Sequence, residues 1–319
     1  MQLEKNIFQS KIMVPILALF ACFLWGSAFP TIKISYQEMA IASEDIYGKM
    51  LFAGYRFLLA SLFLFGWQIF TKKGSSLKVR REDLPFLIRL GLMQTTLQYF
   101  FFYIGLANTS SVKSSILNSL GTFFIVIISH FLYRDDRLNF NKTIGLAAGF
   151  LGVIIINLKG DFNLSFKVIG EGFIILSAVT STIAAIMVKN SKHELDRVLL
   201  TAYQMFIGSL FLIFIAIFRI SPFALQFTWK GILLLIYLAF VSAAAFGIWF
   251  NLIKYNRLGY ISIYRFSIPV TGALLSALLL PEETLSLRAL IALVMVSIGI
   301  IMINRDNRQK GTSGSRVFG

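Results

Sequence analysis

Charged side chains are scarce in this sequence. Only 14% of its 319 residues are Asp, Glu, Lys or Arg, whereas hydrophobic residues make up 57% and the mean hydropathy is +0.75. A soluble domain carries about 25% charged residues, so this chain cannot cover itself with a solvated surface of that kind. The class of soluble globular proteins is therefore excluded, and a lipid bilayer is the natural solvent of the chain.

Cysteine and histidine are nearly absent as well. Cys22 is the one cysteine, which excludes an internal disulfide, and the two histidines, His130 and His193, lie far apart in sequence. The sequence contains no Cys/His spacing typical of a metal site and none of the short motifs of hydrolases, phosphate-binding loops or dinucleotide-binding folds. We therefore expect no catalytic residues, no metal site and no cofactor, and we expect that the protein is not an enzyme.

The charges that are present separate long apolar runs. Five runs hold 20 to 23 uncharged residues and three hold 16 or 17. As helices, the longer runs cross a hydrocarbon core of about 30 Å. The shorter ones also cross it, because Lys and Arg side chains at their ends can snorkel to the membrane surface. Arg56 and Arg265 each interrupt a further run. The pattern predicts an all-α integral membrane protein with ten transmembrane helices. The predicted helices are 12–34, 48–71, 85–107, 112–133, 143–158, 169–189, 198–219, 230–254, 259–280 and 286–304.

Basic residues outnumber acidic ones, 30 against 15, for a net charge of +15. A cytoplasmic N-terminus places 19 of the basic residues in cytoplasmic segments and eight in outer ones, as the positive-inside rule requires. We expect a multi-pass protein of the cytoplasmic membrane with both termini in the cytoplasm, a tail at 1–11 and a polar, disordered tail at 305–319. The excess of basic residues then sets the orientation of the chain in the membrane and contacts anionic lipid. Nucleic acid is not an expected partner.

The two halves of the chain resemble each other. A shift of 148 residues aligns residues 53–65 with 201–213, and a shift of 147 aligns the acidic pair at 135–136 with the pair at 282–283. We predict two five-helix repeats, at 12–160 and at 161–304. Because five is odd, the second repeat enters the membrane in the opposite sense. Such inverted repeats are common in secondary transporters, where they support alternating access.

Four segments carry a resemblance to a known family. They are FLWGSAFPTIK at 23–33, GYRFLLASLFLF at 54–65, SSILNSLGTFFIVIISHFLYRDDRL at 114–138 and SIYRFSIPVTGALLSALLLPEETL at 262–285. Together they resemble the drug/metabolite transporter superfamily and, within it, the EamA family of ten-helix transporters. The resemblance covers about residues 12–304. It implies secondary transport of small metabolites such as amino acids or sugars, and it does not identify the substrate.

Two arginines, Arg56 and Arg265, lie inside apolar runs. An unpaired arginine at mid-depth costs at least about 2.5–3.5 kcal/mol on insertion scales. The runs hold no acidic residue at mid-depth, since Glu171 stands at the end of a span. We hypothesise that Arg265 binds a substrate carboxylate, which a guanidinium holds with two hydrogen bonds, and that Arg56 is a second candidate. Snorkelling toward the membrane surface is the alternative for both.

Polar and aromatic side chains at mid-span complete the candidate site. The 147-residue shift aligns Asn118 with Arg265, and Gln94 and Gln98 share a helix face because they are four residues apart. The predicted substrate-binding residues are Arg265, Asn118, Tyr264, Gln98, Tyr99, Gln94, Tyr203, Gln204, Trp249, Asn251 and Arg56. Interhelical hydrogen bonding is the alternative role for the polar ones. The predicted hinge residues are Trp25, Gly26, Pro30 and Pro269, with a static kink as the alternative.

These features favour a secondary transporter that moves a small metabolite by alternating access. The metabolite would be an amino-acid-like compound or another compound that bears a carboxylate or is amphipathic. A lipid-linked metabolite flippase on the same fold is the alternative, with Arg56 near the outer face. An intramembrane enzyme would have only His130 at depth. The lack of a mid-membrane carboxylate gives proton coupling by the protein less support, and leaves a uniporter, an exchanger or coupling through the protonation of the substrate itself as the alternatives. The sequence leaves the substrate, the direction of transport and the choice between monomer and homodimer open.

Overall fold

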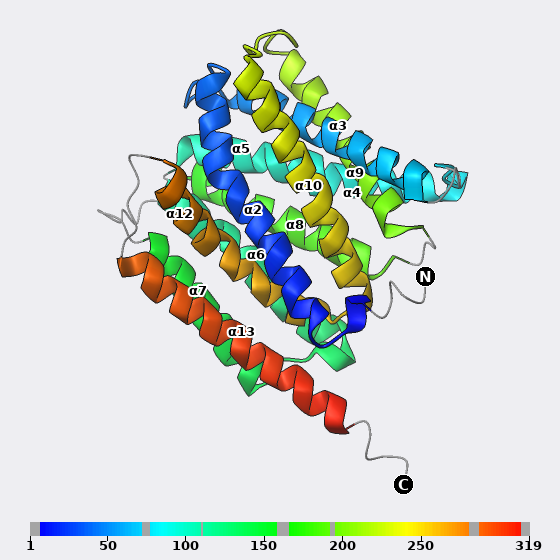
Figure 1. Ribbon diagram of the computed structural model, residues 1–319, viewed down its shortest axis with the longest axis vertical. Coiled ribbons are helices and arrows are strands. Elements are labelled where there is room, and N and C mark those ends of the chain that lie inside the picture. Colours follow the sequence, from blue (N-terminus) through cyan, green and yellow to red (C-terminus); the bar gives the residue numbers. More distant parts are fainter. Residues whose placement is uncertain are drawn as a thin grey trace.

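The regular structure of the chain is helical. The computed structural model describes residues 7–71, 77–109, 111–157, 166–191, 195–280 and 287–313, without the side chains of 111–112 and 306–313. Within these ranges every regular element is a helix and no strand is present (Figure 1). The predicted all-α class is confirmed. Residues 1–6 of the expected N-terminal tail, the acidic pair at 282–283 and residues 314–319 lie outside the described ranges.

Eight long helices run without interruption. They are α2 (Met13–Glu38), α3 (Ile46–Thr71), α6 (Ser111–Leu132), α7 (Phe140–Asn157), α8 (Phe173–Lys189), α9 (Arg197–Ile217), α10 (Trp229–Tyr255) and α13 (Leu287–Ser313). Two further helical runs contain a turn of different geometry. The first consists of α4 (Leu84–Gly91), a π-helical turn (Leu92–Leu97) and α5 (Gln98–Asn108), and the second of α11 (Leu258–Ser262), a 3-10 turn (Ile263–Phe266) and α12 (Ser267–Leu279). Short turns at Arg81–Asp83, Arg134–Asp136 and Val168–Gly172 precede α4, α7 and α8.

Nine helices in the described part of the chain are long and apolar enough to cross a membrane. They correspond to nine of the ten predicted spans. The remaining predicted span, 85–107, coincides with the interrupted run Leu84–Asn108. Its glutamines, threonines and tyrosines make it less apolar than the other nine.

Two helix ends differ from the expected ones. α2 continues to Glu38 rather than ending near residue 34, because Lys33 does not terminate it and the Ser35 hydroxyl donates to the Thr31 carbonyl within the helix. α13 continues to Ser313, beyond residue 305, where a disordered tail was expected. No glycine or proline lies between residues 299 and 311 to end this helix earlier.

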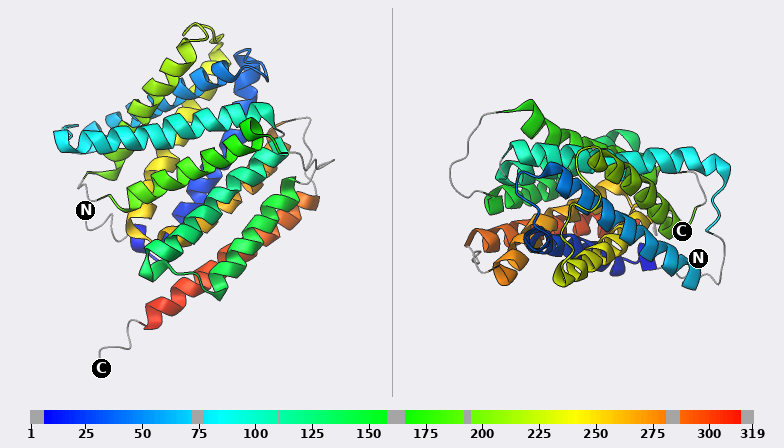
Figure 2. Two further views of the ribbon diagram at one scale, coloured as in Figure 1. Left: turned by 180° about the vertical axis from the view of Figure 1, so that it is seen from behind. Right: turned by 90° about the horizontal axis from the view of Figure 1, so that it is seen from above.

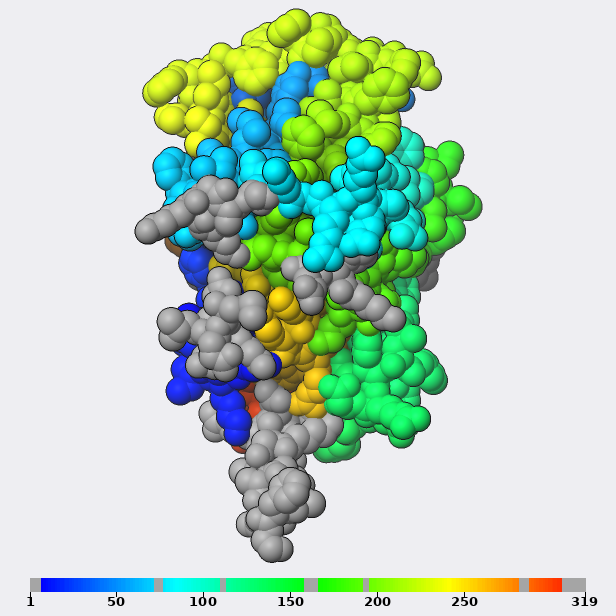
Figure 3. Space-filling view, turned by 90° about the vertical axis from the view of Figure 1, so that its right-hand side faces the viewer, coloured from blue at the N-terminus to red at the C-terminus, as the bar shows by residue number. Residues whose placement is uncertain are grey.

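Helices from the two halves of the chain are interleaved. α7 packs along α13, and α3 packs along α9 (Figure 1). α2 lies against α10 and α12, while α8 lies against α5 and α6 (Figure 2). Each of these contacts joins a helix of the first half to one of the second half. Figure 3 shows the same mixing at the surface, where blue and cyan segments alternate with green and yellow ones.

Glycines bring the backbones of α7 and α13 together. A Cβ atom on Gly145 would lie 2.9 Å from the Gly299 carbonyl oxygen, and one on Gly299 would lie 2.8 Å from that of Gly145. Lipid tails are as apolar as leucine, so helices in a bilayer associate through such close contacts between small residues. The Gly145 region of α7 therefore packs within the molecule.

Buried ion pairs connect elements near the ends of the helices. The Lys142 ammonium binds the Asp136 carboxylate, whose Oδ2 also accepts a hydrogen bond of 2.6 Å from the Gly259 N–H at the start of α11. Lys113 Nζ lies 2.8 Å from Oε1 of Glu171, at the start of the run that contains α8. Both carboxylates are buried and paired, so neither is a free charge in the middle of a helix.

Candidate functional site

A cavity of about 300 Å³ lies among helices of both halves. Its walls come from α2, α3, α5, α6, α8, α10, α12 and the two non-α turns. Seven of the eleven predicted substrate-binding residues line it, namely Arg56, Gln94, Gln98, Tyr99, Asn118, Trp249 and Arg265. The structure therefore brings together side chains that lie more than 200 residues apart in the sequence.

Arg56 extends from α3 into this central cavity. It is 5% exposed, and its Nη2 donates a long hydrogen bond of 3.4 Å to the Tyr99 hydroxyl. The guanidinium carbon lies 4.3 Å from the ring centroid of Phe57 and 5.6 Å from that of Tyr99. Cation–π contacts stabilise a desolvated cation only partly, and the buried Nε has no hydrogen-bond partner. Arg56 therefore does not snorkel to the membrane surface.

Arg265 enters the cavity from the 3-10 turn between α11 and α12. It is half-buried and makes no hydrogen bond or ion pair with any residue in the described ranges. Tyr99, which accepts the hydrogen bond from Arg56, lines the same cavity as Arg265. No acidic residue occurs among the described residues that line the cavity. The site thus carries two positive charges without a counter-charge from those residues.

The irregular backbone near Arg265 has a local cause. Pro269 is the third residue of α12, where a helix needs no N–H donor. In a continuous α-helix its ring would clash with the carbonyl of the residue four positions earlier, which is Arg265. The chain instead forms a 3-10 turn over Ile263–Phe266. The expected continuous helix 259–280 is therefore interrupted, with Pro269 in the first turn of α12 rather than inside a regular helix.

The π-helical turn carries the amide side of the cavity. Gln94 lies in this turn and donates from Nε2 to Oε1 of Gln98 at 2.5 Å, so the two amides do share a face. Neighbouring residues on the other side bind α9. The Thr95 hydroxyl donates to Gln204 Oε1 at 2.9 Å, and the Thr96 hydroxyl donates to the Gly208 carbonyl at 3.0 Å. The π turn thus directs glutamines inward while threonines anchor it.

Four predicted site residues lie outside the central cavity. Tyr264 is fully buried and donates to Asn304 of α13. The Tyr203 hydroxyl donates to the Leu77 carbonyl at 2.7 Å. Gln204 supports the π turn, as described above, and Asn251 lines a separate groove. These side chains fit the alternative of structural hydrogen bonding more closely than contact with a substrate in this cavity.

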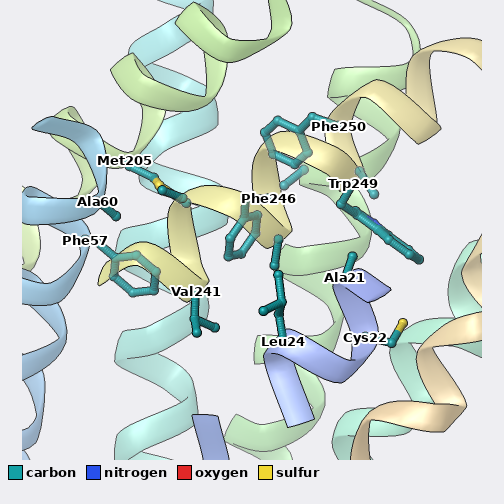
Figure 4. Close-up of a cluster of buried hydrophobic side chains, with 14 of the residues drawn as sticks. Ala21, Cys22, Leu24, Phe57, Ala60, Met205, Val241, Phe246, Trp249 and Phe250 are labelled. Atoms are coloured by element: carbon teal, nitrogen blue, oxygen red, sulfur yellow. The ribbon is translucent and has the colours of Figure 1, made fainter. Parts of the chain in front are cut away.

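Aromatic residues form a wall opposite the amides. The Trp25 ring meets Phe246 at 5.1 Å and Trp249 at 5.4 Å between centroids, in edge-to-face geometry. Figure 4 shows Phe246 and Trp249 projecting from α10 toward α2. Edge-to-face contacts fix the orientation of aromatic rings. The cavity thus combines a rigid apolar wall with two cations and a pair of amides.

Two cavity residues, Tyr36 and Tyr103, are not among the predicted substrate-binding residues. Both line the cavity, and the buried Tyr36 hydroxyl has no hydrogen-bond partner of good geometry. Tyr36 was assigned to an outer loop because the first helix was expected to end near residue 34. A helical spacing of cavity residues could have revealed it, since Trp25, Phe29, Ile32 and Tyr36 recur at i, i+4, i+7 and i+11 along α2.

Helices able to span a membrane make this an integral multi-pass membrane protein, and a cavity between helices of its two halves is typical of the transporter class. The chain belongs to the EamA-like transporter family, whose family model matches residues 12–158 and again residues 168–305. The resemblance seen in the four sequence segments is confirmed. The protein is a transporter and not an enzyme.

Relatives cover nearly the whole chain. The uncharacterized transporter YvbV of Bacillus subtilis (strain 168) is 28% identical over 93% of this chain and 93% of its own length. An uncharacterized transporter of Archaeoglobus fulgidus is 26% identical over 91% of this chain and 98% of its own length. A solved crystal structure, 16% identical, matches with a TM-score of 0.77 over 92% of this chain and 99% of the other. That likeness shows a shared fold.

Proposed function

We propose that this protein is a secondary transporter that moves a small carboxylate-bearing, amphipathic metabolite across the cytoplasmic membrane by alternating access. One observation carries the proposal. Arg56 and Arg265 face one cavity of about 300 Å³, and none of its described lining residues is acidic. A buried cation without a partner is costly, so a bound anion would stabilise this arrangement. Ligand cavities range over about 300–1,000 Å³, and this one therefore favours a small metabolite.

The shape of the substrate follows from the walls. A carboxylate would bind between the two guanidiniums, because a planar fork of donors matches its two oxygens. Gln98 and the Tyr36 hydroxyl offer further polar contacts, and the wall formed by Trp25 and Trp249 would receive an apolar or aromatic group. The proposed substrate class is thus a carboxylate-bearing compound with an apolar side.

The packing supports a fold of ten spans in two inverted repeats. α7 and α13 are equivalent helices under the 147-residue shift, α3 and α9 are equivalent under the 148-residue shift, and each pair packs together. α2 contacts α10 and α12 as its equivalent α8 contacts α5 and α6. The family model also matches twice. The run Leu84–Asn108 would be the tenth span, and the basic residues then favour cytoplasmic termini.

Alternating access requires that one part of the bundle moves against another, and α2 offers a bending point. Pro30 cannot donate to the Gly26 carbonyl four residues earlier, so one hydrogen bond of the helix is missing there. Gly26 also meets α12 closely, since a Cβ atom would lie only 2.9 Å from Cβ of Thr271. Bending at Gly26 and Pro30 would displace Trp25 and thereby open or close the aromatic wall.

The flippase alternative has less support. A flippase would need Arg56 near the outer membrane face, where the guanidinium could bind a lipid headgroup. Arg56 is instead 5% exposed and lies against Phe57 and Tyr99. A carboxylate on a small metabolite therefore fits this position better than a headgroup at the surface.

Counterflow in proteoliposomes tests the proposal. Vesicles containing the full chain are loaded with amino acids or other carboxylates, one at a time, and uptake of the labelled compound is measured. Loss of a charge-assisted contact worth about 1.5–3 kcal/mol predicts that Arg265→Ala weakens the apparent affinity by about tenfold to a hundredfold. Arg219→Ala serves as the matched control, because Arg219 is exposed at the far end of α9. Equal transport by wild type and Arg265→Ala would contradict the role of Arg265.

A further inference from the structure

A second groove lies apart from the central cavity and has a volume of about 720 Å³. It is formed by α3, the beginning of α9 and the second half of α10, and Phe8 closes one end. The lining residues that matter here are Arg197 and Lys254 at one end, Phe63, Trp67 and Phe240 along the apolar side, and Gly247. The central cavity shares none of these residues.

Arg197 lines this lateral groove as a buried cation without sufficient partners. It is 5% exposed, and its Nε and Nη1 atoms have no hydrogen-bond partner in the described part of the chain. The neighbouring Asp196 carboxylate accepts from the backbone N–H groups of Val198 and Leu199 and so caps α9. Buried donors that stay unpaired are costly. An anion in the groove would compensate the positive charge of the Arg197 guanidinium, which lines it.

Away from this charged end, much of the lateral groove is apolar, and several of its aromatic side chains face outward. Phe63, Trp67 and Phe240 are 40%, 62% and 55% exposed, on helices able to span the membrane. Phe240 and Lys254 are 14 residues apart on α10, which corresponds to about 21 Å along the helix. This length exceeds half of a hydrocarbon core of about 30 Å. The groove therefore has a charged end and a long apolar side that opens toward the bilayer.

We propose that the lateral groove binds one anionic glycerophospholipid. Its phosphate would contact Arg197 and the exposed Lys254, and an acyl chain would lie along Trp67 and Phe240. The charged end adjoins the N-terminal segment, because Asn256 Nδ2 donates to the Phe8 carbonyl at 2.8 Å. The distribution of basic residues assigns this end to the cytoplasmic side, where the leaflet is rich in anionic lipid.

Native mass spectrometry of the delipidated full chain in detergent tests this site. Phosphatidylglycerol and phosphatidylcholine with identical acyl chains are titrated separately. We expect the anionic lipid to bind about tenfold more tightly, because a guanidinium–phosphate contact is charge-assisted. Arg197→Gln should abolish the preference, whereas Arg219→Gln, a change at an exposed residue in the turn that follows the other end of α9, should preserve it. Equal binding of both lipids to the wild type would overturn the proposal.

A second variant blocks the groove without removing its charge. A Cβ atom on Gly247 would meet only Leu64 Cδ2, at 3.9 Å, so Gly247→Leu fits the fold while its side chain fills the space. It should reduce binding of phosphatidylglycerol at least as strongly as Arg197→Gln does. If the lipid binds this variant as tightly as the wild type, the lateral groove is not its site.

A third titration distinguishes a lipid from a free anion. Glycerol phosphate carries the same phosphate as the lipid and lacks the acyl chains. We expect it to compete with phosphatidylglycerol only weakly, because the apolar side of the groove then stays empty. Competition at concentrations equal to those of the lipid would show that the site takes soluble anions, and the lipid proposal would be wrong.

Discussion

The buried pair formed by Asp136 and Lys142 provides a quantitative test of how the loop between α6 and α7 is held. The two side chains are 1% and 0% exposed. Lys142 Nζ also donates to the Asp136 carbonyl at 2.8 Å, and Asp136 Oδ2 accepts from the Gly259 N–H at the start of α11. Removing one partner of such a pair leaves a buried, uncompensated charge, which costs about 3–5 kcal/mol.

A double-mutant cycle measures this energy. We expect Asp136→Asn and Lys142→Met each to lower the free energy of unfolding by about 3–5 kcal/mol. The double variant buries no charge, so it should be more stable than the two single losses predict, by about 1–3 kcal/mol. Reversible unfolding in mixed micelles, followed by tryptophan fluorescence, reports these differences.

An exposed pair supplies the control for this cycle. Lys230 Nζ lies 2.6 Å from Glu38 Oε1, but the two side chains are 64% and 27% exposed. Its removal should cost less than about 1 kcal/mol, because water screens exposed charges. Two results would refute the argument that burial makes the Asp136–Lys142 pair strong. One is a loss of stability below about 1 kcal/mol in each single variant. The other is a loss in the double variant that equals the sum of the two single losses.

Four further changes have defined outcomes. Gly208→Ala should destabilise the fold, seen as a lower unfolding midpoint, because its Cβ atom would lie 2.5 Å from the Gly91 carbonyl oxygen; an unchanged midpoint would contradict the close packing of α9 on α4. Tyr36→Phe should weaken substrate affinity in counterflow and leave the unfolding midpoint unchanged, since its hydroxyl has no hydrogen-bond partner of good geometry in the described part of the chain. Arg56→Lys should bind substrate less well than the wild type, because an ammonium cannot form the two parallel bonds of a guanidinium; equal affinity would exclude such bonding. Glu171→Gln should lower the unfolding midpoint, because Glu171 accepts from Lys113 and Thr109 at 2.8 and 2.7 Å; loss of transport at full stability would assign it to coupling instead.

The helical spans could be predicted because charges are costly inside a bilayer and therefore bound the apolar runs. Charges do not mark the end of a helix where a basic side chain is tolerated within it. Lys33 was taken as the end of the first helix, but α2 continues to Glu38, as long basic side chains can reach the membrane surface. Arg197 directly precedes the predicted span 198–219, where a solvated charge is expected, although the structure buries it. Nothing in the local sequence distinguishes these two cases.

The composition of the central cavity was only partly predictable. Arg56 and Arg265 stood out because they interrupt apolar runs, and both line the cavity. Periodicity alone could not orient neighbouring residues. Trp249 and Asn251 are two positions apart, hence about 200° apart around α10, and they line different spaces. Tyr264 precedes Arg265 but turns toward α13 instead.

Backbone irregularities limited the prediction further. The π turn at Leu92–Leu97 and the 3-10 turn at Ile263–Phe266 depend on contacts with other helices. Thr96, for example, bonds to a carbonyl of α9 that is 112 residues away in the sequence. Such turns are often found at functional sites. In this protein they carry Gln94 and Arg265 into the central cavity.

The central claim is that the two arginines recognise a carboxylate. The most direct measurement compares counterflow of the best carboxylate substrate with that of its uncharged amide, in wild type and in Arg265→Ala. A contact of about 1.5–3 kcal/mol predicts at least about a tenfold preference of the wild type for the carboxylate. We expect this preference to fall toward unity in Arg265→Ala, because the carboxylate then loses a guanidinium partner. An unchanged preference in the correctly folded variant would contradict it.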